Sequence, residues 1–83
     1  MELEEVFARL SSEKEVRRFL KDLLSQKEYE SLVERWKVVL LLEKGHSYRE
    51  ISEITGVSTA TVTRVSKCLN ASRSGYRLAL DLN

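Results

Sequence analysis

The sequence predicts an all-α fold, a small helical domain that contains a helix-turn-helix. The chain has 83 residues, no proline and only three glycines, so few positions would interrupt a helix. A serine followed three residues later by a glutamate occurs at Ser12, Ser25 and Ser47, which is typical of a capping box at the start of a helix. Apolar residues also recur at spacings of three and four, as on one face of a helix. This length corresponds to one domain over residues 1–83.

The first 44 residues are predicted to form three helices that build the core and the dimerisation surface. The third helix is predicted from about Gln26 to Lys44, and Gly45 ends it as a C-terminal cap. Apolar residues nearly encircle its second half, and Trp36 is expected in the core. Because a domain this small buries little surface alone, we expect a second copy to cover part of this helix. The apolar stripes of the three helices are Leu3, Val6, Phe7, Leu10; Val16, Phe19, Leu20, Leu23; and Leu32, Val33, Trp36, Val38 to Leu42.

The segment "SYREISEITGVSTATVTRVSKCLN" at residues 47–70 is predicted to be a helix-turn-helix. Its first helix starts at Ser47 and points Ile51 and Ile54 inward, and Gly56 begins a sharp turn that leads to an N-cap at Ser58. The β-branched run "STATVTRV" favours a strand, but no other segment has the pattern of a partner strand. A helix over 59–69 is therefore predicted. Its inward face would carry Val62, Val65 and Leu69, and its outward face Ala60, Thr63, Arg64 and Lys67.

The charge pattern makes the second half of the chain basic. Residues 1–34 hold six basic and nine acidic residues, and residues 35–83 hold eight and four, so the net charge of +1 combines −3 with +4. This pattern fits contact with a polyanion, and it also fits an ordinary solvated face. On charge alone, the candidate phosphate contacts are Lys44, Lys67, Arg73 and Arg77.

Several classes of protein are not expected. The single Cys68 and single His46 allow no internal disulfide and no ligand cluster for a metal. The chain lacks a nucleophile–base pair and a phosphate-binding glycine loop, so no enzyme and no catalytic residues are predicted. The N-terminus is acidic and the longest apolar run is "VVLLL", so a cytoplasmic protein without membrane contact is expected.

Two stretches resemble the Trp repressor family. The run "REISEITGVSTATVTR" at 49–64 is similar to the family's DNA-reading head, and "LSQKEYESLVERWKVVLLLEKG" at 24–45 is similar to its core helix, with one residue deleted near His46. The likeness covers most of residues 24–70, and the short chain resembles the smaller YerC/YecD-type branch. It implies an intertwined homodimer that represses transcription at a palindromic operator in double-stranded DNA. The implied DNA contacts are Arg49, Thr59, Ala60 and Thr63, and Lys67 lies on the same predicted face.

The resemblance also raises the question of tryptophan, which is a corepressor in this family. The candidate effector pocket comprises Arg35 and Arg64, which match two arginines that sandwich the ligand, and Ser25, which replaces a threonine. The glycine that follows the second arginine in the tryptophan-binding member is Val65 here. Since its isopropyl group would fill the space of the indole, we expect no tryptophan cofactor, and an unidentified small effector stays open.

Two functional hypotheses follow. The first is a DNA-binding regulator with a core at 1–44, a helix-turn-helix at 47–69 and a C-terminal segment at 70–83. The second is a helical protein–protein interaction module whose basic half docks an acidic partner. A preference for one duplex sequence distinguishes the regulator from the adaptor.

Overall fold

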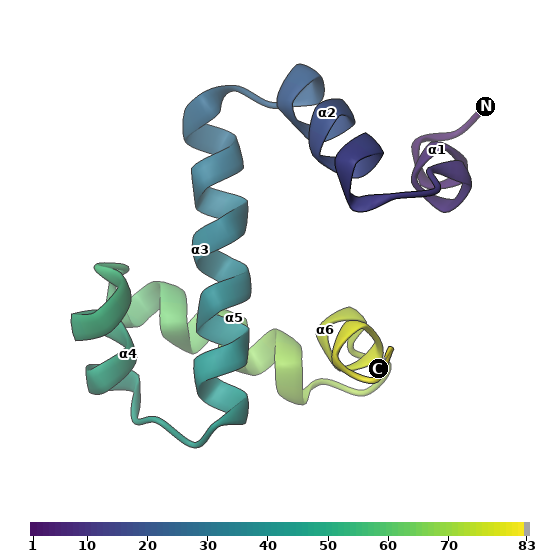
Figure 1. The fold of residues 1–83 in the computed structure, drawn as a ribbon. Helices are drawn as coiled ribbons and strands as arrows, with labels where there is room; N and C mark the ends of the chain where they lie inside the picture. The colour runs from purple at the N-terminus through teal and green to yellow at the C-terminus, as the bar shows by residue number, and fades with distance from the viewer. Residues whose placement is uncertain (83) are drawn as a thin grey trace. The chain divides into compact units, whose positions relative to one another are not determined.

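The structure is a computed structural model that describes residues 1–82, and all its regular elements are helices (Figure 1). The prediction of an all-α fold is confirmed. The chain divides into two units, Met1–Ser31 and Leu32–Asn83, and the boundary falls inside the third helix. The helices are α1 Leu3–Arg9, α2 Glu13–Leu23, α3 Gln26–Glu43, α4 Tyr48–Thr55, α5 Thr59–Asn70 and α6 Gly75–Leu80.

Serine caps begin most of these helices, largely as the sequence predicts. At Ser47 the hydroxyl accepts a hydrogen bond from the backbone N–H of Glu50 at 3.1 Å, and the Glu50 carboxylate accepts one from the Ser47 N–H at 2.9 Å. Ser25 and Glu28 make the same reciprocal pair. At Ser12 the predicted cap is confirmed, since its hydroxyl accepts from the N–H of Glu15 at 3.2 Å. The reciprocal half of the box is absent, because the carboxylate of Glu15 accepts hydrogen bonds from the N–H and hydroxyl of Ser11 instead. The caps of α1 by Glu2 and of α6 by Ser74 were not predicted.

The first unit contains α1, α2 and the start of α3, and none of the residues in α1 or α2 is fully buried. Phe7 and Phe19 join the first two helices through an edge-to-face contact, with ring centroids 5.3 Å apart. The ammonium of Lys21 lies 5.8 Å from the ring centroid of Tyr29. The apolar stripes predicted for α1 and α2 therefore exist, but they are only partly covered within one chain.

The second unit has a small aliphatic core. Three helices supply it, with Val38 and Val39 from α3, Ile51 from α4, and the inward face of α5. The predicted inward residues Val62, Val65 and Leu69 are all buried. Leu41, Leu42, Val57, Tyr76 and Leu80 pack around its edge.

Glycine and an ion pair shape the end of α3. Gly45 has φ +90°, and its N–H donates to the carbonyl of Leu42 while the next N–H, of His46, donates to that of Leu41. These two bonds form the left-handed cap that glycine favours. Arg77 on α6 then binds Glu43 with two hydrogen bonds of 2.6 and 3.0 Å, so the last helix is tied to the end of α3.

Two apolar residues are more exposed within one chain than the sequence predicts. Ile54, expected to point inward on α4, is 60% exposed, because the inward face of this short helix is filled by Ile51. Trp36, expected in the core, is 37% exposed. It lies on a face of α3 that includes Leu32, Val33 and Leu40, which are all about as exposed.

Three carboxylates at the ends of helices should make the fold sensitive to acid. The hydrogen bond from the Ser47 N–H lowers the pKa of Glu50, the Ser25 N–H lowers that of Glu28, and Arg77 lowers that of Glu43. A pKa that is lower in the folded chain stabilises the fold at high pH, and this stability is lost as pH falls through the folded pKa. Urea unfolding followed by circular dichroism should give a midpoint that is flat near neutrality and falls below about pH 4.5, the ordinary value for glutamate. Glu50→Gln should lower the midpoint at pH 7 and flatten its fall in acid, and an unchanged slope would contradict this account.

Candidate nucleic-acid interface

Helix α4 is anchored on one side and free on the other. The reciprocal cap at Ser47 and Glu50 starts the helix, and Ile51, one residue later, is completely buried against α3 and α5. Arg49 lies on the opposite side, and its side chain is 91% exposed. The first helix of the motif therefore presents an arginine to solvent from a backbone that is fixed by the core.

The turn between α4 and α5 is held by glycine and by short polar side chains. Gly56 has φ +79°, a conformation that side chains with a Cβ rarely adopt, and its N–H donates to the carbonyl of Ser52. The Ser52 hydroxyl donates to the carbonyl of Val57 at 2.6 Å, and the Val57 N–H donates to the Thr55 hydroxyl at 3.3 Å. Ser58 then caps α5 by accepting from the N–H of Thr61, as predicted. This network sets the direction in which α5 starts.

The buried face of helix α5 carries its valines, and Thr59 and Thr63 lie outside the core. The valines at 62 and 65 lie in the core, whereas Thr59 and Ala60 are exposed and Thr63 is half-buried. The hydroxyl of Thr63 donates to the carbonyl of Thr59 at 2.9 Å, so its proton is used within the helix. Arg64 and Lys67 are exposed on the same side. The structure thus brings together the predicted residues 59, 60, 63 and 67 on one surface of one helix.

Arg49 has a partner that the sequence analysis missed. Its Nε lies 3.4 Å from Oε1 of Glu53, one turn further along α4. The spacing of four residues on a helix is the signal that could have identified this pair. A carboxylate therefore stands beside the arginine that the resemblance implies for base contact.

The other basic candidates are spread over several elements. Lys44 follows α3, and Arg73 precedes α6 with φ +57°, a left-handed conformation that is uncommon outside glycine. Arg77 is bound to Glu43 by the ion pair described above, so its charge is already matched. Of these three, none shares the outward face of α5.

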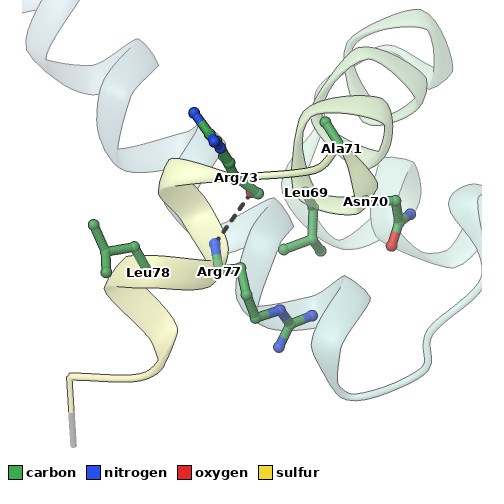
Figure 2. A pocket seen from close by; sticks show the side chains of 7 residues that line it. Leu69, Asn70, Ala71, Arg73, Arg77 and Leu78 are labelled. Carbon is green, nitrogen blue, oxygen red and sulfur yellow. Dashed lines mark hydrogen bonds between the residues drawn. The ribbon is translucent and has the colours of Figure 1, made fainter.

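A pocket of about 620 Å³ lies at the junction of α5 and α6. Figure 2 shows that the guanidinium groups of Arg73 and Arg77 extend away from one another. The backbone N–H of Arg77 donates to the Ser74 hydroxyl at 3.2 Å. The two arginines therefore do not converge on a common anion. The pocket is completed by Leu69, Asn70, Ala71, Ser74 and Leu78.

The candidate effector residues fall in both units. Ser25 belongs to the first unit, where its hydroxyl and N–H are both engaged with Glu28 at the start of α3. Arg35 and Arg64 belong to the second unit and are exposed. Val65, which follows Arg64, is 3% exposed and packs in the core with Val62 and Leu69.

The remaining chemistry of the described chain is sparse. Cys68 is a free, exposed thiol on α5. His46 places its Nδ1 3.8 Å from Oε2 of Glu50, which itself caps α4. Among residues 1–82, no three His, Cys, Asp or Glu side chains are arranged to hold a metal ion. Over the same residues, none of the helices has the length and apolar character needed to cross a membrane.

Comparison with known proteins agrees with this geometry. A family model described as Trp repressor protein matches residues 1–83. The uncharacterized protein YerC of Bacillus subtilis (strain 168) is 40% identical, over 96% of this chain and 80% of its own length. The crystal structure of a TrpR like protein from Eubacterium eligens ATCC 27750 is 33% identical and superposes with a TM-score of 0.85 over 94% of this chain and 80% of that one. The chain therefore belongs to the Trp repressor family, whose members are DNA-binding regulators and not enzymes.

Proposed function

We propose that this protein is a cytoplasmic transcriptional regulator, and specifically a repressor, that binds a palindromic operator as a homodimer. The observation that carries the proposal is the outward surface of α5, where Thr59, Ala60 and Thr63 stand free of the core on a helix whose other face is buried. Small side chains let the helix backbone approach base edges in the major groove. The family to which the chain belongs supports the same class of function.

Each residue has a distinct role in this proposal. Thr63 offers hydroxyl lone pairs and a methyl group to base edges, and Ala60 and Thr59 offer apolar contact with thymine methyl groups. Arg49 reaches a base or a phosphate from the start of α4, and Lys67 contacts phosphate. Contacts to bases determine which sequence is bound, whereas contacts to phosphates set affinity for all sequences.

The proposed homodimer rests on apolar surface that one chain leaves uncovered. Four apolar side chains of α3 are each about 40% exposed, and α1 and α2 have no buried residue. Apolar side chains exposed together on one helix are typical of an interface between subunits. A second copy that covers it would place two recognition helices about a twofold axis, which calls for a palindromic site.

Selection of binding sites from random duplex DNA is the primary test. The expected result is a palindrome whose half-sites lie about one helical turn apart.

Thr63→Ala should relax the preference at one position of each half-site by about 1–3 kcal/mol, while Lys67→Ala should weaken binding to all duplexes alike. Selected sites without twofold symmetry would contradict the proposal that a homodimer binds DNA through two symmetry-related recognition helices. Binding without any sequence preference would favour the protein-interaction module instead.

Glu53 should restrain DNA binding through its contact with Arg49. Arg49 must leave this carboxylate before it contacts DNA, and the carboxylate is repelled by nearby phosphates. Glu53→Gln should therefore tighten operator binding, by about twofold for each recognition unit given the weakness of exposed pairs on helices. Fluorescence anisotropy at fixed salt measures this change.

Two controls isolate the contact from the change in net charge. Glu13→Gln makes the same charge change on α2 and should alter affinity less than Glu53→Gln does. In an Arg49→Ala background, Glu53→Gln should lose most of its effect. If Glu53→Gln weakens binding, the carboxylate contacts DNA directly and the restraint is wrong.

Tryptophan should not act as a corepressor, because Val65 occupies the core beside Arg64. Titration calorimetry with tryptophan should show no binding in the micromolar range, and operator affinity should be unchanged. Val65→Gly should admit weak binding at a cost of at least about 1 kcal/mol in stability. Micromolar binding to the unmutated protein, coupled to tighter operator binding, would show that Val65 leaves the pocket open.

A further inference from the structure

Among the described residues of the second unit, the polar side chain of Ser66 on α5 is buried, at 5% exposed. Its hydroxyl oxygen accepts a hydrogen bond from the hydroxyl of Tyr48, 18 residues earlier in the chain. The side-chain amide of Asn70 donates to the same oxygen at 3.3 Å. The bond from Tyr48 to Ser66 therefore connects a residue of α4 directly to a residue of α5.

The position of this bond along the two helices is informative. The turn at 56–58 joins the end of α4 to the start of α5, and Ile51 packs against Val62 and Val65 further along. Tyr48 is the first residue of α4, so its bond to Ser66 lies at the end of the helix pair that is remote from the turn. The pair is thereby joined at both ends, covalently at one and by hydrogen bonding at the other.

We propose that Tyr48 and Ser66 form a clamp that sets the angle between α4 and α5, and so positions the recognition surface against DNA bases. Both are positioning residues, because neither belongs to the exposed face at 59, 60 and 63. This inference rests on the proposed function in DNA reading. It adds a residue pair that determines specificity without contacting a base.

A hydrogen bond suits this role better than the apolar core does. Aliphatic contacts are non-directional and tolerate small rotations of one helix on another, whereas a hydrogen bond weakens steeply as its angle and length depart from the optimum. An alanine at position 66 would satisfy burial without the cost of desolvating a hydroxyl, so the contribution of Ser66 is directional.

The lever arm is long enough to matter for base contacts. Without the bond at Ser66, α5 could tilt about the turn that joins it to α4. Thr63 lies five residues from Ser58, which is about 7.5 Å along an α-helix. A tilt of about 10° about the turn would move Thr63 by about 1.3 Å, more than the range of about 0.5 Å that hydrogen-bond lengths allow. Loss of the clamp should therefore affect base readout before it affects contacts to phosphates, which tolerate larger displacements of a flexible side chain.

The test compares three variants with a matched control. Tyr48→Phe removes the donor, Ser66→Ala removes the acceptor, and the double variant removes both without leaving a buried hydroxyl unpaired. Tyr76→Phe is the control, because it removes the hydroxyl of another tyrosine at the edge of the same core. For each protein, fluorescence anisotropy gives the ratio of affinities for the selected operator and for a scrambled duplex, and urea unfolding gives stability.

The expected result is a loss of about three- to tenfold in the affinity ratio for Tyr48→Phe, for Ser66→Ala and for the double variant alike, which corresponds to one hydrogen bond. Affinity for the scrambled duplex should stay within about twofold of the unmutated protein, and Tyr76→Phe should leave the ratio unchanged. Similar losses in the single and double variants indicate that the two residues act as one unit.

Two outcomes would overturn the clamp. One is an unchanged affinity ratio in Tyr48→Phe with lower stability, which would make the bond purely structural. The other is additive loss in the double variant. The angle between α4 and α5, measured by residual dipolar couplings in the free protein, should also change in Tyr48→Phe, and an unchanged angle would reject the clamp even if the protein bound no DNA. Absence of sequence preference in the unmutated protein would instead reject the proposed function, so the two failures can be distinguished.

Discussion

The insertion of Ile51 into the core of α3 and α5 is the contact on which the rest of the second unit depends. The core consists of six aliphatic side chains, four of them valines, and Ile51 is its contribution from α4. Truncating a buried aliphatic residue costs about 2–5 kcal/mol, against about 5–15 kcal/mol for the stability of a typical domain. Because Ile51 lies two residues from Arg49 and packs against α5, the same contact supports the helix, the turn and the exposed recognition surface.

The amino-acid composition of helix α5 suits its two faces, the core and the proposed DNA-reading surface, although it lowers the helix propensity. Its β-branched residues are poor helix formers, and burial of Val62 and Val65 compensates for them on the inner face. On the outer face, threonines are short, polar and able to return a hydroxyl proton to the helix, as Thr63 does to Thr59. The conflict between a strand-like sequence and a helical structure is therefore resolved by packing, and it is concentrated at the proposed DNA-reading site.

Polar contacts at the edges of the core convert a loose set of helices into a defined arrangement. Caps at Ser47 and Ser58 fix where α4 and α5 begin, and the pair of Arg77 and Glu43 attaches α6 to the end of α3. The pairing of Arg49 with Glu53 adds a local electrostatic restraint at the surface. The uncovered apolar face of α3 and the absence of buried residues in α1 and α2 explain why assembly with a second copy belongs to the proposed function.

The sequence by itself determined the features that depend on neighbours along the chain. Helix periodicity and serine caps located α3, α4 and α5, glycine located the two left-handed turns, and the spacing of valines and threonines separated the two faces of α5. Only the tertiary structure decided which apolar residues are covered, since the burial of Ile54 or Trp36 depends on whether another segment lies over it and not on its own periodicity. It also decided the bonds of Arg77 with Glu43 and of Tyr48 with Ser66, which span 34 and 18 residues. No local pattern encodes such pairs, because their distance is set by how the helices pack.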